Sequence, residues 1–341
     1  MAMNIKLKGA VVGVLAGVLA VSGCSASASK KDTVDVVGFS ILKTPNEAVF
    51  DAFNDTTDGK DVPFTTSYGA SGDQSRAVEA GQKASYVHLS LESDVTRLVD
   101  AGLVDENWKD NPTKGVLTSS VVVFVVRPGN PENIQTWDDL VKPGVEVITP
   151  NPASSGGARW NILAAWGSVI SQGGSEADAS AYISKLFKNT INLPGSAREA
   201  TSAFVDNGQG DVLLSYENEA ILAKQSGQDV DYVIPPQTLL IENTGALLKS
   251  AKEPAEKFFE FLHTEEAQQI YAGFGFRPVG VQLTDFATEG ANDPANPFPT
   301  PDTLLTIDGD FGGWGEAKTK YFDEEDGIIV KLLAAAGKET E

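Results

Sequence analysis

Short apolar segments rich in β-branched residues alternate with amphipathic segments along most of this 341-residue chain. This alternation is typical of an α/β fold, in which helices cover the faces of a largely parallel sheet. The continuous apolar run at 121–126 indicates a strand that is buried on both faces. A stretch rich in Pro, Asn and Asp at 284–301 predicts a long surface loop. We expect further strands at 34–39, 62–68, 145–149, 211–216 and 232–234, and helices at 46–54, 71–80, 156–166, 197–207 and 253–262.

The first residues have the pattern of an export signal rather than of a folded domain. Lys6 and Lys8 precede an apolar run at 9–21, which is shorter than the roughly 20 apolar residues that a permanent membrane helix needs. The length of the run and its basic flank are typical of a secretory signal peptide. We predict that this signal peptide spans residues 1–23.

A lone cysteine ends this segment, in the sequence Val21-Ser22-Gly23-Cys24. A single Cys cannot form an intrachain disulfide, and these four residues resemble the lipobox of bacterial lipoproteins, in which the Cys is lipidated and becomes the new N-terminus. The alternative is a chance Cys beside an ordinary cleavage site. We expect a lipid anchor on Cys24 and a flexible tether at 24–31. The chain would then be exported and held at the outer face of the cytoplasmic membrane, at the cell surface or in the periplasm.

The chain is strongly acidic, with 26 Lys and Arg against 47 Asp and Glu, a formal charge of −21. This balance argues against nucleic-acid binding, which uses a basic face, and against any membrane contact other than the lipid anchor. It does not exclude an anionic ligand, because net charge is screened over roughly 8 to 10 Å at physiological salt. A recessed site built from oriented amides acts at shorter range than that.

Three stretches place Ser or Gly at the predicted start of a helix that follows a strand. Ser71 and Ser196 each stand three residues before a Gln or Glu, which is the pattern of a capping box. The second of these boxes opens the helix at Ala197. The third stretch, 154–157, reads Ser-Ser-Gly-Gly.

A helix start leaves up to four N–H groups without an intrahelical partner and carries about half a positive charge from the helix dipole. Glycines allow an anion to approach the backbone closely, and serine hydroxyls add donors. Several such starts that face one cleft would bind an anion without a Lys or Arg counter-charge. Each motif alone is also consistent with a purely structural helix cap.

Residues 148–161 read Ile-Thr-Pro-Asn-Pro-Ala-Ser-Ser-Gly-Gly-Ala-Arg-Trp-Asn. In this stretch and in several shorter ones the chain resembles the bacterial sulfate/thiosulfate-binding proteins of ABC importers. The matching stretches occur in the right order over nearly the whole mature chain. The shorter ones lie at 105–108, 123–131, 137–140, 142–145, 211–214, 217–220, 276–278 and 311–314.

The resemblance implies a type II periplasmic-binding-protein fold. In this fold two lobes, each a mixed sheet flanked by helices, are hinged by crossing strands and close on the ligand. It implies lobe I at 32–121 plus 243–341 and lobe II at 122–242. In this family neutral donors hold the anion, mostly backbone amides at helix starts. The matching residues of this sequence are Ser71 in the first lobe, Ser155, Gly156 and Gly157 at the second-lobe helix start, and Ala197 at a third helix.

Two positions depart from the family pattern. Phe39-Ser40 replaces a frequent Tyr-Asp, but the family contact there is a backbone amide that Ser40 can still supply. Tyr216 replaces a ligand-binding Trp. An indole N–H only donates, whereas a phenol donates or accepts, so Tyr216 weakens the argument for sulfate over hydrogen phosphate. The alternative is that Tyr216 is a packed aromatic at a strand end.

No arrangement of residues indicates an enzyme, a metal site or a cofactor. The two histidines, His88 and His263, belong to no metal-like cluster, and the chain has no Gly-x-x-x-x-Gly-Lys-Ser/Thr loop. Arg159 and Arg198 each lie just inside a proposed anion-binding helix, where we expect roles on the helix surface or behind the ligand contacts.

We therefore expect a monomeric binding protein, not an enzyme, that captures sulfate or thiosulfate and delivers it to an ABC permease. Phosphate, molybdate and tungstate are alternative ligands of the same shape. A surface interaction lipoprotein that has kept the fold but lost transport is the alternative from a different class.

Overall fold

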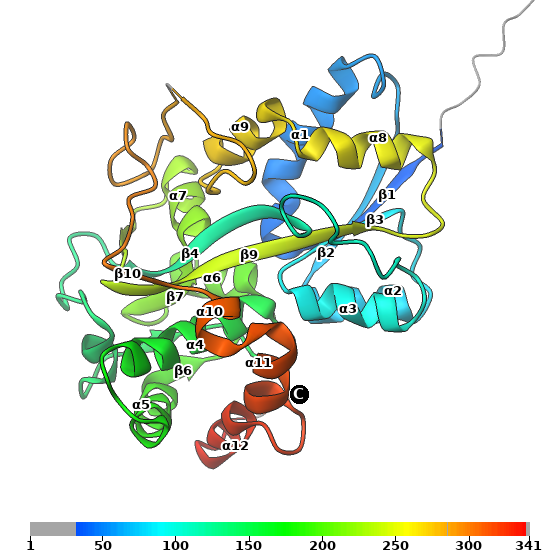
Figure 1. Ribbon diagram of the computed structural model, residues 1–341. Coiled ribbons are helices and arrows are strands. Elements are labelled where there is room, and N and C mark those ends of the chain that lie inside the picture. Colours follow the sequence, from blue (N-terminus) through cyan, green and yellow to red (C-terminus); the bar gives the residue numbers. More distant parts are fainter. Residues whose placement is uncertain (1–31, 285, 339–341) are drawn as a thin grey trace, which may run out of the picture. The chain divides into compact units, whose positions relative to one another are not determined.

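The computed structural model describes residues 32–284 and 286–338, which form a mixed α/β structure around a ten-stranded sheet (Figure 1). The main strand order is β2-β1-β3-β9-β4-β7-β5-β6, with β10 paired to β9 and β8 paired to β4. The predicted signal peptide and tether lie outside the described residues. The strands are β1 Val34–Phe39, β2 Phe64–Gly69, β3 Tyr86–Leu89, β4 Val116–Val126, β5 Val147–Ile148, β6 Thr190–Asn192, β7 Val212–Tyr216, β8 Asp231–Val233, β9 Gln237–Leu247 and β10 Thr303–Leu305.

Twelve α-helices and two short 3-10 turns connect the described strands. The first turn, η1, spans Ser40–Leu42, and the second, η2, spans Trp137–Val141. The helices are α1 Lys43–Asp55, α2 Ser71–Glu79, α3 Glu92–Asp100, α4 Gly156–Ser171, α5 Glu176–Asn189, α6 Ala197–Val205, α7 Glu217–Gln225, α8 Glu253–Leu262, α9 Glu265–Gly273, α10 Ile307–Phe311, α11 Gly313–Phe322 and α12 Ile328–Ala335.

Two long antiparallel strands, β4 and β9, join the two halves of the sheet. The first part of β4 pairs with β9, and its last residues, Val122–Val126, pair with β7. Strand β9 in turn pairs with β3 through Thr244–Leu247. Residues 117–126 of β4 are all buried, which confirms the prediction of a strand covered on both faces. The crossing strands expected from the sequence are therefore β4 and β9.

Each half of the sheet contains three parallel strands, with β1 between β2 and β3 and with β5 between β6 and β7. Parallel strands place their carboxyl ends at one edge, which is where ligands bind in open α/β sheets. The turn η1 follows β1, helix α2 follows β2, α6 follows β6 and α7 follows β7. Helix α4 follows β5 after a short loop. The starts of these elements thus lie at the binding edges of the two halves.

The C-terminal helices pack on elements from both halves of the sheet. Helix α12 contacts α5, helix α11 contacts α3, and β10 pairs with β9. The division into lobes at 32–121 plus 243–341 and 122–242 stays a prediction. The loop predicted at 284–301 is confirmed for its described residues, which form turns and irregular backbone.

His88 is buried in β3, where its ring contacts Phe39 and Tyr271. Its Nε2 lies 3.1 Å from Thr118 Oγ1, and its Nδ1 is buried with no hydrogen-bond partner. Burial away from water, with a smaller contribution from His263, lowers the pKa of His88 to about 3. The folded protein therefore keeps this imidazole neutral.

We predict that His88 makes the protein sensitive to acid. Because its folded-state pKa lies below the ordinary 6.5, the unfolded chain binds a proton between these values and the folded chain does not. The free energy of unfolding should fall as pH drops through this window, by up to about 1.4 kcal/mol per pH unit from this residue. Urea unfolding above and below the ordinary histidine pKa should show a shallower pH dependence for His88→Gln. An unchanged slope in this variant would contradict the assignment.

Candidate functional site

The start of α4 is the centre of the candidate site. Ser155 is the N-cap residue and is buried, but its side chain makes no capping hydrogen bond. Gly156 and Gly157 form the first helical positions, and both are buried. The sequence predicted this helix start correctly.

Close packing surrounds both glycines, and at Gly156 a side chain would force its neighbours to shift. A Cβ on Gly156 would lie 2.4 Å from Ser90 Oγ, and a Cβ on Gly157 would lie 3.2 Å from Ala197 Cβ and 3.3 Å from Tyr216 Cε1. The first turn of α4 therefore lies against the segment after β3, the start of α6 and the end of β7. Four residues selected from the sequence, Ser155, Gly157, Ala197 and Tyr216, meet there.

Ser71 occupies a different helical position from the one predicted. The N-cap residue of α2 is Ala70, and Ser71 is the first residue of the helix, so the prediction of a Ser71 cap is wrong. Its hydroxyl instead donates to Asp94 Oδ2 at 2.6 Å and accepts from the Ser90 amide at 2.9 Å. With its one hydroxyl proton used in this way, Ser71 can offer an anion its backbone N–H. First-turn amides have no intrahelical partner.

Ser196 has the role that the sequence predicted for it. Its side chain accepts from the Glu199 amide, and the Glu199 carboxylate accepts from the Ser196 amide, which completes the capping box of α6. This cap fixes the start of the helix at Ala197, which is buried against Gly157. Ser40 is the first residue of η1, and the next residue, Ile41, accepts through its carbonyl from Arg198 of α6. Phe39, which precedes Ser40, lies beside Tyr216, with ring centroids 6.3 Å apart.

Two contacts join loops and helix starts from the two halves of the sheet. The Gly72 amide of α2 donates to the Ser154 carbonyl before α4 at 3.2 Å. Arg198 of α6 donates to the Ile41 carbonyl of η1 at 3.4 Å. The first contact joins two backbone groups and the second joins a guanidinium to a backbone carbonyl, so each ties an element of one half to an element of the other.

Ser90 and Asp94 are the residues that sequence reasoning missed. Ser90 follows β3, and its Oγ lies 2.7 Å from the Tyr216 hydroxyl, a partner 126 residues away. Asp94 lies in α3, where burial raises the pKa of its carboxyl and the nearby Arg159 opposes that rise. Both are single polar residues without a local motif, so only the fold could have revealed them.

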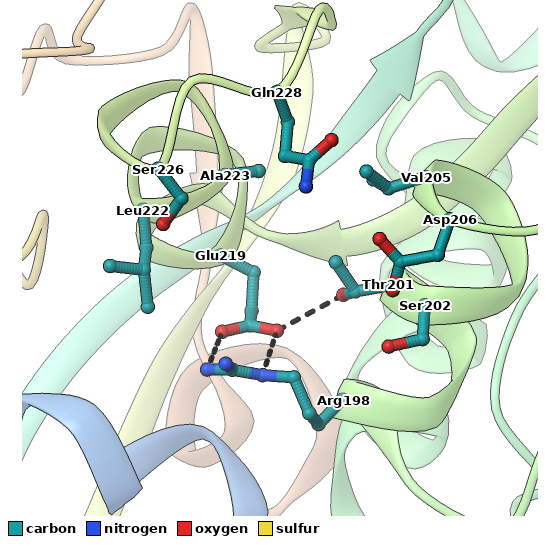
Figure 2. A pocket seen from close by; sticks show the side chains of 10 residues that line it. All are labelled: Arg198, Thr201, Ser202, Val205, Asp206, Glu219, Leu222, Ala223, Ser226 and Gln228. Atoms are coloured by element: carbon teal, nitrogen blue, oxygen red, sulfur yellow. Dashed lines mark hydrogen bonds and ion pairs between the residues drawn. The ribbon is translucent and has the colours of Figure 1, made fainter.

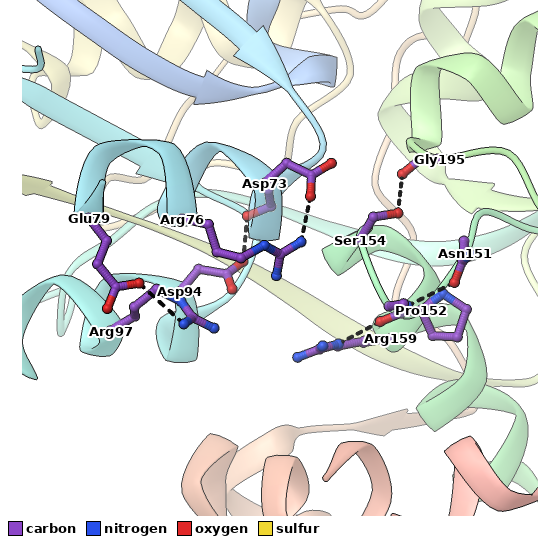
Figure 3. A network of polar contacts seen from close by, with 12 residues as sticks. Asp73, Arg76, Glu79, Asp94, Arg97, Asn151, Pro152, Ser154, Arg159 and Gly195 are labelled. Atoms are coloured by element: carbon purple, nitrogen blue, oxygen red, sulfur yellow. Dashed lines mark hydrogen bonds and ion pairs between the residues drawn. The ribbon is translucent and has the colours of Figure 1, made fainter. Parts of the chain in front are cut away.

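The arginines near the site are engaged by protein groups. Figure 3 shows Arg76 and Arg97 on the side of α2 and α3, paired with Asp73 and Glu79, and Arg159 on the side of α4. Arg159 donates to the Pro152 carbonyl at 2.9 Å, and its guanidinium lies 5.1 Å from the centre of the Phe322 ring.

Arg198 forms a bidentate ion pair with Glu219 beside a small pocket between α6 and α7 (Figure 2). The shorter contact is 2.7 Å, and Thr201 also donates to this carboxylate at 3.0 Å. The Glu219 side chain is only 2% exposed. Because water screens this pair little, the carboxylate neutralises the charge of Arg198. Arg198 is therefore engaged by Glu219 and by the Ile41 carbonyl.

Within the described residues, we looked for two other features, a cluster of metal ligands and a helix able to span a membrane. Across residues 32–284 and 286–338, His, Cys, Asp and Glu side chains do not gather in threes as a metal would require. Within the same ranges, the helices are too short or too polar to cross a bilayer.

Comparison with known proteins identifies the family. Residues 34–277 match the model of the bacterial extracellular solute-binding proteins. The chain belongs to this family. A sulfate-binding protein of Synechocystis is 39% identical over 89% of this chain and 87% of its own length. The solved sulfate-binding protein SubI of Mycobacterium tuberculosis is 44% identical, covers 86% of this chain and 100% of its own, and superposes with a TM-score of 0.80. A thiosulfate-binding protein of Pseudomonas aeruginosa is 33% identical over 77% of this chain and 80% of its own length.

Within this solute-binding family, the chain groups with the sulfate- and thiosulfate-binding proteins. It also shares the two-lobe fold of more distantly similar proteins, such as a periplasmic thiamin-binding protein with a TM-score of 0.64 at 19% identity. That more distant likeness concerns the fold alone.

An ion pair connects two of the stretches that carry the family resemblance. Arg277 donates to Glu217, the first residue of α7, at 2.7 Å, and the Glu217 side chain is fully buried. Burial raises the pKa of the Glu217 carboxyl, and Arg277 opposes that rise. The Arg277 amide also donates to the Ser119 carbonyl in β4. The pair thereby holds the end of β7, and with it Tyr216, against the crossing strand.

We predict that Arg277→Met lowers the free energy of unfolding by about 3 kcal/mol, because it leaves a buried carboxylate without its partner. Adding Glu217→Gln should restore part of this loss, since the second change removes the unpaired charge. Urea unfolding followed by tryptophan fluorescence measures both effects. Lys257→Met, which breaks the exposed Lys257–Glu260 pair, is the matched control and should change little. Equal losses in the two methionine variants would contradict the prediction.

Proposed function

We propose that this protein captures sulfate or thiosulfate outside the cytoplasmic membrane and delivers the anion to an ABC permease. The observation that carries the proposal is the convergence of Gly157, Ala197 and Tyr216 at the start of α4, because first-turn amides have no partner within their own helix and favour an anion. Relatives named as sulfate-binding and thiosulfate-binding proteins, similar over most of the chain, support the choice of ligand.

The proposed ligand donors are the backbone amides of Ser40, Ser71, Gly156, Gly157 and Ala197, together with the hydroxyl of Ser155. Tyr216 completes the ligand-binding set at the position of the family's ligand-binding Trp. A hydrogen bond to a charged group contributes about 1.5 to 3 kcal/mol. Closure of lobe I on lobe II would exclude water and strengthen each of these bonds. A few such bonds are enough for micromolar or tighter binding without a cationic side chain.

We predict that the wild-type protein, stripped of ligand by unfolding and refolding, binds sulfate in isothermal titration calorimetry and that Gly156→Asp abolishes this binding. The substitution introduces a carboxylate beside the anion, in a space that cannot hold even a Cβ. Gly315→Asp is the matched control, because Gly315 is exposed in α11 with no atom within 4 Å of its Cβ position. The control should bind sulfate as the wild type does.

Sulfate binding of wild-type strength in folded Gly156→Asp would refute the site. A wild-type protein that binds neither sulfate nor thiosulfate would refute the proposed function. Titration with both anions also decides which of the two is preferred.

We further infer that the mature chain is a monomer anchored by a lipid on Cys24. The sequence Val21-Ser22-Gly23-Cys24 and its place after an apolar run support this proposal. In a bacterial host, wild-type protein should fractionate with membranes and be released by detergent, whereas Cys24→Ser should not be lipidated. An unlipidated wild-type chain in mass spectrometry would contradict the anchor.

A further inference from the structure

A buried pair of hydroxyl groups lies beside the proposed anion site. Ser90 and Tyr216 are each 1% exposed, and their side-chain oxygens are 2.7 Å apart. Ser90 belongs to the first half of the sheet and Tyr216 ends β7 in the second half. The pair therefore links the two halves directly behind the start of α4.

One of the two hydroxyl protons of this pair finds no acceptor among the neighbouring groups of the described residues. A hydroxyl group has one proton and can accept further hydrogen bonds, so the pair holds two protons, and their mutual bond uses one. The other contact that the structure records for these two oxygens brings a further donor, since Trp160 Nε1 donates to Ser90 Oγ at 3.2 Å. The described residues offer no acceptor for the second proton.

The direction of the mutual bond decides which residue carries the free proton. A phenol is a stronger acid than an aliphatic hydroxyl, so Tyr216 serves best as the donor to Ser90 across their 2.7 Å contact. Ser90 Oγ then accepts from Tyr216 and Trp160 and keeps its own proton. The same oxygen lies 2.4 Å from the Cβ position of Gly156, so it faces the backbone that the anion would contact.

We propose that Ser90 is a further ligand-binding residue, which donates its hydroxyl proton to the anion while Tyr216 holds that hydroxyl in place. This inference rests on the proposed function and extends it. In this protein Ser90 and Tyr216 together take the place of the single indole donor found at the Tyr216 position in the resembling family. Ser90 is also positioned by Ser71, whose Oγ accepts from the Ser90 amide at 2.9 Å.

The same proton count predicts which class of anion the site accepts. A protonated oxyanion, such as hydrogen phosphate, would need an acceptor from the protein. If Ser90 accepted that proton, it would have to donate to Tyr216, and the Tyr216 proton would then be buried without a partner. The pair therefore favours fully deprotonated tetrahedral anions, such as sulfate and selenate, over hydrogen phosphate and hydrogen arsenate.

Calorimetric titration of the mature wild-type protein, Ser90→Ala and Tyr216→Phe with sulfate tests this role. Ser90→Ala should weaken sulfate binding by about tenfold or more, because it removes a donor to a charged acceptor. Tyr216→Phe should weaken it by a smaller factor, because Ser90 keeps its proton. If the pair only fastened the two halves together, both variants would break the same bond and lose affinity equally, and the proposal would be wrong.

Selenate and arsenate provide a second measurement, because the two anions are similar in size and differ in protonation. The wild type should prefer selenate, and Ser90→Ala should narrow this preference, since hydrogen arsenate can then turn its hydroxyl toward the vacated position. Ser90→Cys carries a weaker donor than serine, so its preference for selenate should lie between those of the wild type and Ser90→Ala. It replaces Ser90→Ala if that variant does not fold.

The outcomes separate this inference from the proposed function. Sulfate binding by the wild type that is unchanged in folded Ser90→Ala overturns the role of Ser90 alone. Absence of sulfate and thiosulfate binding in the wild type overturns the proposed function itself. Thermal unfolding in chloride buffer without sulfate shows whether each variant is folded.

Discussion

The site depends on N–H groups at the starts of helices, which cannot be satisfied within the helices themselves. In each half of the sheet parallel strands end at one edge, and helices or turns begin directly after them. Gly156 and Gly157 allow the start of α4 to approach Ser90, Ala197 and Tyr216 within van der Waals distance. An anion is the ligand that such a collection of donors accommodates best.

The net negative charge of this protein would by itself disfavour an anionic ligand, but the local groups near the site have more influence on binding. The chain is strongly acidic, and its arginines near the site are paired with Asp73, Glu79 and Glu219 or bonded to a backbone carbonyl. An anion is therefore expected to bind to dipoles and hydroxyls at short range, where the screened net charge has little effect. Neutral donors also allow release to a permease, because no buried cation is left unpaired.

Much of this arrangement could be predicted from the sequence, because it depends on local patterns. The apolar run of β4, the capping box at Ser196 and the Ser-Gly start of α4 were all correctly placed. The Ser71 cap was wrong because the hydroxyl accepts from the Ser90 amide and donates to Asp94, 23 residues away, instead of accepting from an amide of its own helix. Ser90 could not be found, because its bond to Tyr216 exists only after β3 and β7 are brought together.

The most direct test of the account is a crystal structure of the mature protein with selenate bound, in which the anomalous signal of selenium locates the anion. We expect one strong peak between the first turns of α2, α4 and α6. The ligand oxygens should be within hydrogen-bonding distance of the Ser71, Gly156, Gly157 and Ala197 amides and of Ser90 Oγ, with no Lys or Arg nitrogen in contact. A peak held instead by Arg76, Arg97 or Arg159 would contradict the claim that uncharged donors bind the ligand.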